Sequence, residues 1–154
     1  MGTRGFYGFR YKKKYYMVYN PYDSYFSCLG KKLLKEIKNM IANNQFEKWL
    51  LLFLNLKVID NKNEEENNLI RYDASFINLL NSGYILIEEI DDFQKKINFS
   101  KYDGEYFYIL DFDKKKFIVY ALGFRIQKYN LFNEEINNVY FDDSNCEEDS
   151  SDSE

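Results

Sequence analysis

The sequence predicts an α+β fold in which an N-terminal β-hairpin, two central helices and a C-terminal β-hairpin form one antiparallel sheet packed by helices. Aromatic, β-favouring segments occur near both ends of the chain, and helical periodicity is confined to the middle. This separation of strands from helices favours α+β over a doubly wound sheet. The chain has 154 residues, 45% of them hydrophobic, which is enough for one domain with a substantial core.

The N-terminal hairpin is predicted from two aromatic segments, residues 5–11 and 15–19, which flank three lysines at positions 12–14. β-Favouring residues on both sides of a short polar loop are typical of a hairpin. The pair Asn20-Pro21 then ends the second strand.

The middle of the chain carries the helical signals. Apolar residues recur at helical spacing through residues 31–43. Residues 45–56 are apolar nearly all round, which predicts a buried helix. A short third helix is expected over residues 74–80, ended by the Asn-Ser-Gly at 81–83, and a strand over residues 84–90.

The C-terminal hairpin is predicted from residues 106–112 and 117–122, which flank the polar turn at 113–116. Residues 124–129 add a further candidate strand. With the earlier elements, these segments account for one globular α+β domain over residues 1–140.

Charge is unevenly distributed along the chain. The first 40 residues hold 9 basic and 2 acidic side chains, whereas residues 142–154 hold 7 acidic and no basic ones. Acidic runs of this kind are usually solvated, so residues 141–154 are expected to form a disordered tail. The tail either improves solubility or covers the basic N-terminal region. Ser144 and Ser151 each precede a glutamate by three positions and are candidate phosphorylation sites.

The composition excludes several kinds of chemistry. The absence of histidine rules out histidine-based triads, histidine zinc ligands and histidine proton shuttles. Two cysteines, Cys28 and Cys146, cannot form a disulfide framework or a cysteine-rich metal cluster. With no signal-peptide core and no apolar run long enough for a membrane helix, we expect a soluble cytoplasmic protein without a metal or cofactor.

Three short blocks form a constellation in the N-terminal part: MGTRG at 1–5, YNPYDSY at 19–25, and LG at 29–30. They resemble an uncharacterised family of small proteins from fungi, large DNA viruses and phages, which begin MGTRG or MGTRS and continue into a segment close to YNHWDSYPxGLG. EYFYILDFD at 105–113 is similar to the family's EWTYTIDLD, and residues 117–123 to its VFxVxNG.

The resemblance implies a fold module rather than an activity. The family's His-Trp pair is Pro21-Tyr22 here, so any histidine chemistry elsewhere in the family is lost. Our leading hypothesis is a non-enzymatic binding module in which the N-terminal hairpin and residues 20–30 (the 20–30 loop) contact a protein or a small ligand. The candidate binding-face residues are Arg4, Asn20, Asp23, Ser24, Tyr25 and Gly30.

Two alternatives remain open. An N-terminal-nucleophile amide hydrolase would use Thr3 after processing, with Asn20 in the oxyanion hole and Asp23 or Arg4 orienting the amine. A single-stranded nucleic-acid binder would use the lysines at 12–14 and the tyrosines around them. A hairpin whose alternate aromatics contribute to the core already explains these residues, and we favour that interpretation of them.

Overall fold

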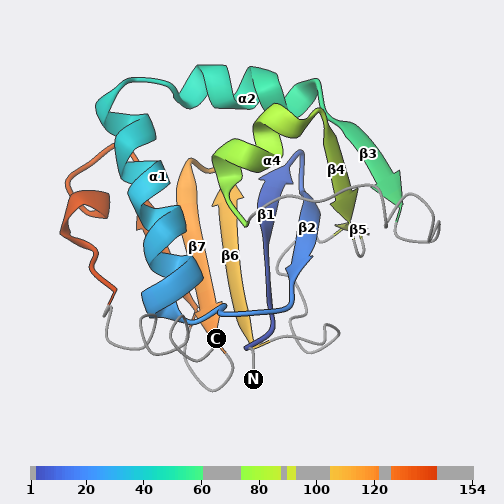
Figure 1. Cartoon of the computed structure of the whole chain (residues 1–154). Coiled ribbons are helices and arrows are strands. Elements are labelled where there is room, and N and C mark those ends of the chain that lie inside the picture. Colours follow the sequence, from blue (N-terminus) through green and yellow to red (C-terminus); the bar gives the residue numbers. More distant parts are fainter. Residues whose placement is uncertain (1–2, 61–73, 88–89, 93–104, 122–125, 142–154) are drawn as a thin grey trace.

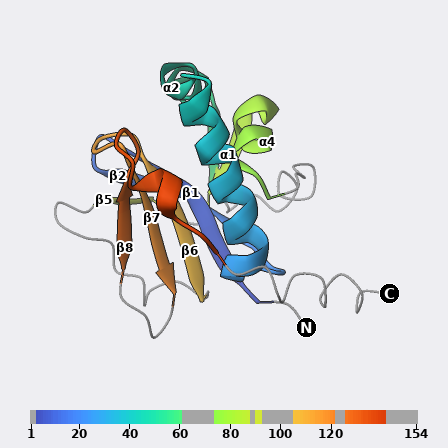
Figure 2. The same ribbon diagram turned by 90° about the vertical axis from the view of Figure 1, so that its left-hand side faces the viewer.

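A six-stranded sheet lies at the centre of the computed structural model, and helices cover one of its faces (Figure 1). The structure describes residues 3–60, 74–87, 90–92, 105–121 and 126–141. Seen along the edge of the sheet, the helices form a separate layer (Figure 2). The strand order is β5-β2-β1-β6-β7-β8, formed by β1 (Gly5–Tyr11), β2 (Lys14–Asn20), β5 (Ile90–Asp92), β6 (Tyr106–Asp111), β7 (Lys116–Ala121) and β8 (Gln127–Asn130).

The predicted α+β class and both hairpins are confirmed, but the sheet is mixed rather than antiparallel throughout. β1 and β6 pair in parallel, from Gly5 beside Tyr106 to Arg10 beside Asp111. The other pairings of this sheet are antiparallel. Parallel neighbours need a long crossover, usually helical, and the helical middle of the chain provides it. The two hairpins therefore lie side by side and point in the same direction.

In the part of the crossover that the structure describes, three helices and a small second sheet lie between the hairpins. A short helical turn, η1 (Phe26–Gly30), leads into α1 (Lys31–Ala42), which is followed by α2 (Phe46–Leu54) and α4 (Phe76–Ser82). The second sheet has two parallel strands, β3 (Lys57–Asp60) and β4 (Tyr84–Ile87). The expected third helix and the strand after it are thus present, and a last helical turn, η3 (Ile136–Asn138), follows β8.

Local signals explain the bounds of α4. The Ser75 hydroxyl accepts a hydrogen bond from the Asn78 amide at 3.1 Å, as expected of an N-cap. Glu36 of α1 accepts from the Phe76 amide at 2.8 Å, which joins the two helices. At the other end Gly83 takes a φ of 85°, a left-handed conformation that stops the helix.

Helix α2 differs from its prediction. The apolar pattern predicted a fully buried helix, but Leu51 is 61% exposed and Leu54 is 48% exposed. The buried side is formed by Phe46, Trp49 and Phe53. Apolar residues all round a helix do not specify which sides the rest of the fold will cover.

Aromatic side chains are buried on both faces of the main sheet. The helix-covered face includes Tyr7 and Phe9 of β1, which pack with residues of α1 and α4. The opposite face buries Phe6, Tyr15, Met17, Phe107, Ile109 and Ile118. The alternating aromatic residues of the N-terminal hairpin therefore contribute to the core, as predicted by the interpretation that needs no nucleic-acid ligand. No helix in the described ranges is long and apolar enough to cross a membrane.

Candidate functional site

The turns of the two hairpins lie next to each other at one end of the sheet (Figure 2). β1 and β6 are parallel neighbours, so the turn that follows β1 and the turn that follows β6 meet at the same edge. Strands are about 4.8 Å apart, so the centres of the two turns are separated by about 10 Å. We call this region the lysine end; its six lysines are Lys12, Lys13, Lys14, Lys114, Lys115 and Lys116.

Asp113 joins the two turns directly. Its Oδ1 accepts a hydrogen bond from the Lys12 amide at 2.8 Å, and its Oδ2 accepts from the Lys13 amide at 2.9 Å. Lys12 and Lys13 have φ values of 51° and 67°, as a two-residue hairpin turn of this hand requires. The carboxylate thereby fixes the position of one lysine turn relative to the other.

A buried ion cluster lies beneath these turns. Arg10 is 6% exposed and Asp111 is 2% exposed, and they are partners in the β1–β6 register. The Arg10 Nη1 donates to Asp111 Oδ2 at 3.3 Å and to Asp113 Oδ2 at 3.1 Å. Arg10 is thus neutralised within the fold, and its role here is to position the turns.

Burial dominates the titration behaviour of this cluster. It raises the pKa of Asp111, and the opposing effects of a hydrogen bond from the Lys114 amide and of the Arg10 charge are smaller. Burial also raises the pKa of the Tyr15 phenol. The Arg10 guanidinium carbon lies 5.4 Å from the centre of the Tyr15 ring, which adds a cation–π contact to the cluster.

The six lysines, in contrast, lie at the surface. Five of these residues are exposed and Lys116 is half-buried, and none forms an ion pair among the described residues. The Lys12 Nζ lies 5.5 Å from the Tyr11 ring centre, and the Lys115 Nζ lies 5.9 Å from the ring of Phe132, which is 56% exposed. The lysine end is therefore a concentrated positive surface with an accessible aromatic ring at its border.

The 20–30 loop lies at the opposite end of the sheet. Within the hairpin, Lys14 pairs with Tyr11 but Asn20 pairs with Gly5. Six residue steps along a strand span about 20 Å. The lysine turn and the 20–30 loop, which the sequence analysis combined in one binding face, are thus separated by the length of a strand.

Polar groups of the loop bond to one another and to the start of the sheet. The Asn20 Nδ2 donates to the Tyr22 carbonyl at 2.6 Å and to Ser24 Oγ at 2.8 Å. Ser24 is fully buried; its amide donates to the Thr3 carbonyl at 3.1 Å, and its own carbonyl accepts from the Tyr108 hydroxyl at 2.7 Å. This bonding closes the loop onto the first residues of the chain.

Two glycines allow this close packing. A Cβ on Gly5 would lie 2.7 Å from the Ser24 Cβ, and one on Gly30 would lie 2.9 Å from the Tyr108 hydroxyl. The Tyr25 ring packs edge-on against Tyr106, with 5.9 Å between ring centres. These contacts explain Gly5, Tyr25 and Gly30 of the motif by packing.

The remaining predicted site residues lie around this corner. Asp23 has a φ of 56°, and its carbonyl accepts from the Leu29 amide at 3.2 Å. Arg4 is exposed, and its carbonyl accepts from the Glu105 amide at 2.8 Å. Thr3, the nucleophile of the hydrolase alternative, is only 5% exposed. The predicted phosphorylation sites and the rest of the acidic tail lie outside the described residues, apart from Phe141.

The second lysine turn was not predicted from the sequence as part of the site. Both turns carry three lysines, and oppositely charged residues, Arg10 and Asp111, precede them at the strand ends. That pairing of charges was the available signal for parallel neighbours. It becomes decisive only when β1 and β6 are known to be adjacent.

Comparisons of the chain with family models, curated proteins and solved structures found no match. The resemblance of the two terminal blocks to the MGTRG family therefore stays a prediction.

Proposed function

We propose that the protein is a binding module without a catalytic role, and that its lysine end binds the phosphate backbone of single-stranded nucleic acid. One observation carries the proposal: Asp113 joins two lysine turns, which are 100 residues apart in the sequence, into one positive surface. Lysines that neutralise phosphates release counterions, and this release supplies most of the affinity of such sites.

The border of the lysine end favours a single strand over a duplex. Phe132 exposes more than half of its surface beside Lys115. An accessible aromatic face beside cations suits an unpaired base, which can stack on it. The tyrosines around the first lysine turn are less suitable, because two of them, Tyr7 and Tyr15, are buried in the two core layers.

Binding at the lysine end replaces the face first expected at the 20–30 loop. The amide of Asn20 and the hydroxyl of Ser24 bond within the chain, which supports a structural role for the loop. The burial of Thr3 likewise supports binding rather than hydrolysis.

Fluorescence anisotropy with a labelled oligothymidylate tests the proposal. Six lysine–phosphate contacts predict that log K falls with log salt at a slope of about −4. The double variant Lys13→Gln/Lys114→Gln should reduce the slope magnitude by about 1.4 and weaken binding roughly 10-fold at low salt. The matched control, Lys32→Gln/Lys35→Gln, removes the same charge from exposed positions on α1 and should leave binding unchanged.

Phe132→Ala separates base stacking from charge. Loss of one stacked base should weaken binding to the single strand by roughly 10-fold without changing the salt slope. Absence of binding at low salt, or equal losses in the test and control pairs, would refute the proposal. Tighter binding to duplex DNA than to the single strand would contradict the stacking role.

A further inference from the structure

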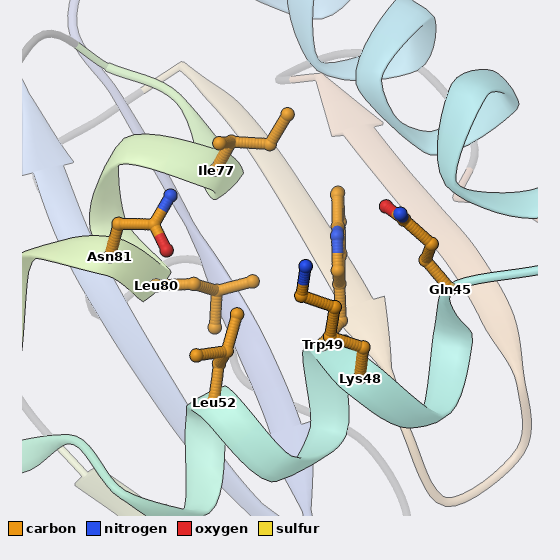
Figure 3. Close-up of a pocket in the computed structure, with 7 residues that line it drawn as sticks. All are labelled: Gln45, Lys48, Trp49, Leu52, Ile77, Leu80 and Asn81. Atoms are coloured by element: carbon orange, nitrogen blue, oxygen red, sulfur yellow. The ribbon is translucent and has the colours of Figure 1, made fainter. Parts of the chain in front are cut away.

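A small pocket lies between α2 and α4 (Figure 3). Figure 3 shows Leu52 of α2 and Leu80 of α4 facing each other, with the Trp49 ring beside them. The volume is about 100 Å³. The complete lining is Gln45, Lys48, Trp49, Leu52, Ile77, Leu80 and Asn81.

The pocket has an apolar interior and a polar, cationic rim. Lys48 and Asn81 are exposed and Gln45 is half-buried. Within the described parts of the chain, the side-chain nitrogen and oxygen atoms of these residues have no hydrogen-bond partner. An occupant can therefore bring its own polar groups to the rim without displacing an existing bond.

Apolar surface continues beyond the pocket. Ile77 is 39% exposed and Leu51 is 61% exposed. Leu51 is three residues after Lys48 on α2 and therefore lies next to it on the helix surface. These two residues give an occupant of the pocket further apolar surface to contact.

Size limits the class of occupant. Pockets for small molecules usually have volumes of about 300–1,000 Å³, several times larger than this one. A cavity of about 150 Å³ in another protein holds benzene, so this pocket suits one branched aliphatic side chain. The Lys48 ammonium at the rim favours a carboxylate beside that side chain.

We propose that this pocket binds an acidic peptide segment of a partner protein, with one leucine-like side chain between α2 and α4 and a neighbouring carboxylate on Lys48. The assignment rests on the pocket and its rim and is independent of nucleic-acid binding at the lysine end. Glu47, the neighbouring acid on α2, precedes Lys48 but does not line the pocket.

Trp49 is the only tryptophan of the chain, so its fluorescence reports on the pocket directly. The probe is the capped peptide Asp-Glu-Leu-Glu-Asp, compared with Asp-Glu-Ala-Glu-Asp and Lys-Lys-Leu-Lys-Lys. We expect a saturable change in Trp49 emission with a dissociation constant of about 1 mM or below for the acidic leucine peptide. The alanine peptide should bind at least roughly 10-fold more weakly.

Charge reversal at the rim tests the orientation. Lys48→Glu should lower the affinity for the acidic leucine peptide roughly 5-fold and raise the affinity for the lysine peptide, whereas Lys35→Glu on α1 should change neither affinity. Ile77→Ser should lower the affinity for both leucine-containing peptides. No saturable signal, or equal binding of the acidic and lysine peptides to the wild type, would overturn the proposal. Emission that changes with protein concentration alone, together with dimer formation in sedimentation, would identify a second copy as the occupant instead.

Discussion

Replacing Asp113 by alanine should destabilise the fold more than any ordinary surface substitution. The carboxylate accepts hydrogen bonds from two backbone amides of the first turn and from Arg10. Alanine removes all three and leaves Arg10 with Asp111 as its remaining carboxylate partner in the cluster. The contact between the two hairpin turns then loses its hydrogen-bonded link.

The expected loss follows from these contacts. Hydrogen bonds to a charged group contribute about 1.5–3 kcal/mol each. The Asp113 side chain is 25% exposed, and water can replace it at the two turn amides, so these bonds count for less. We therefore expect a total loss of about 2–3 kcal/mol. Asp113→Asn should cost about half of that, because the side-chain amide oxygen can still accept a hydrogen bond from one of the two backbone amides of the first turn.

Urea denaturation measures this loss as a shift of the midpoint at constant slope. Glu134→Ala is the control, since this exposed acid has no side-chain hydrogen bond among the described residues; it should change stability by less than about 0.5 kcal/mol. A loss below about 1 kcal/mol would refute the role given to Asp113.

Two further predictions concern the core. Burial raises the pKa of Tyr108 well above its ordinary value of 10.0, so the unfolded chain loses the proton first and the free energy of unfolding should fall as pH rises above 10. Tyr108→Phe should make that fall less steep in alkaline denaturation, while costing about 1–2 kcal/mol at neutral pH through its lost bond to Ser24; an unchanged slope would contradict this. A Cβ on Gly8 would lie 1.9 Å from the Tyr16 carbonyl oxygen, so Gly8→Ala should cost about 2–4 kcal/mol in thermal unfolding. Gly83→Ala meets no neighbour within 4 Å and should cost about 1 kcal/mol, from its positive φ alone; equal losses at both glycines would refute the steric argument.

Local signals predicted most of the elements. The β-favouring runs on both sides of each polar turn identified the two hairpins, whereas α4 begins after its Ser75 cap rather than at residue 74 and continues to Ser82 before Gly83 ends it. The N-terminal aromatics were correctly explained as core, because alternation on a strand directly reports which residues share a face.

Strand neighbours could not be predicted in the same way. The alternation in β1 is identical whether its second neighbour is parallel or antiparallel, so the pattern does not select β6 or its direction. Arg10 and Asp111 specify that pairing through charge, but a charge pair becomes visible only after the register is known. The separation of the lysine turn from the 20–30 loop was missed for a related reason, since positions close in sequence on a hairpin can lie at its opposite ends.

The pocket between α2 and α4 could not be predicted from the sequence either. Residues 45–56 carry apolar side chains in every direction, and periodicity cannot show that Leu51 and Leu54 stay exposed while Trp49 and Phe53 are covered. Only the placement of α4 beside α2 creates the cavity. Its polar rim comes from residues that any solvated helix would carry.

The parallel pairing of β1 with β6 also constrains the order in which the strands can pair while the chain is being synthesised. β1 ends at Tyr11 and β6 ends at Asp111, so β1 leaves the ribosome 100 residues before β6 is complete. At synthesis rates of about 5–20 residues per second, roughly 5–20 s pass between the synthesis of β1 and the completion of β6. During that time the inner edge of β1 exposes unpaired amides and carbonyls, which is a hazard for association between nascent chains. We expect pulse-labelled hydrogen exchange on stalled chains to protect the β1 amides only once β6 has emerged; earlier protection would disprove this order.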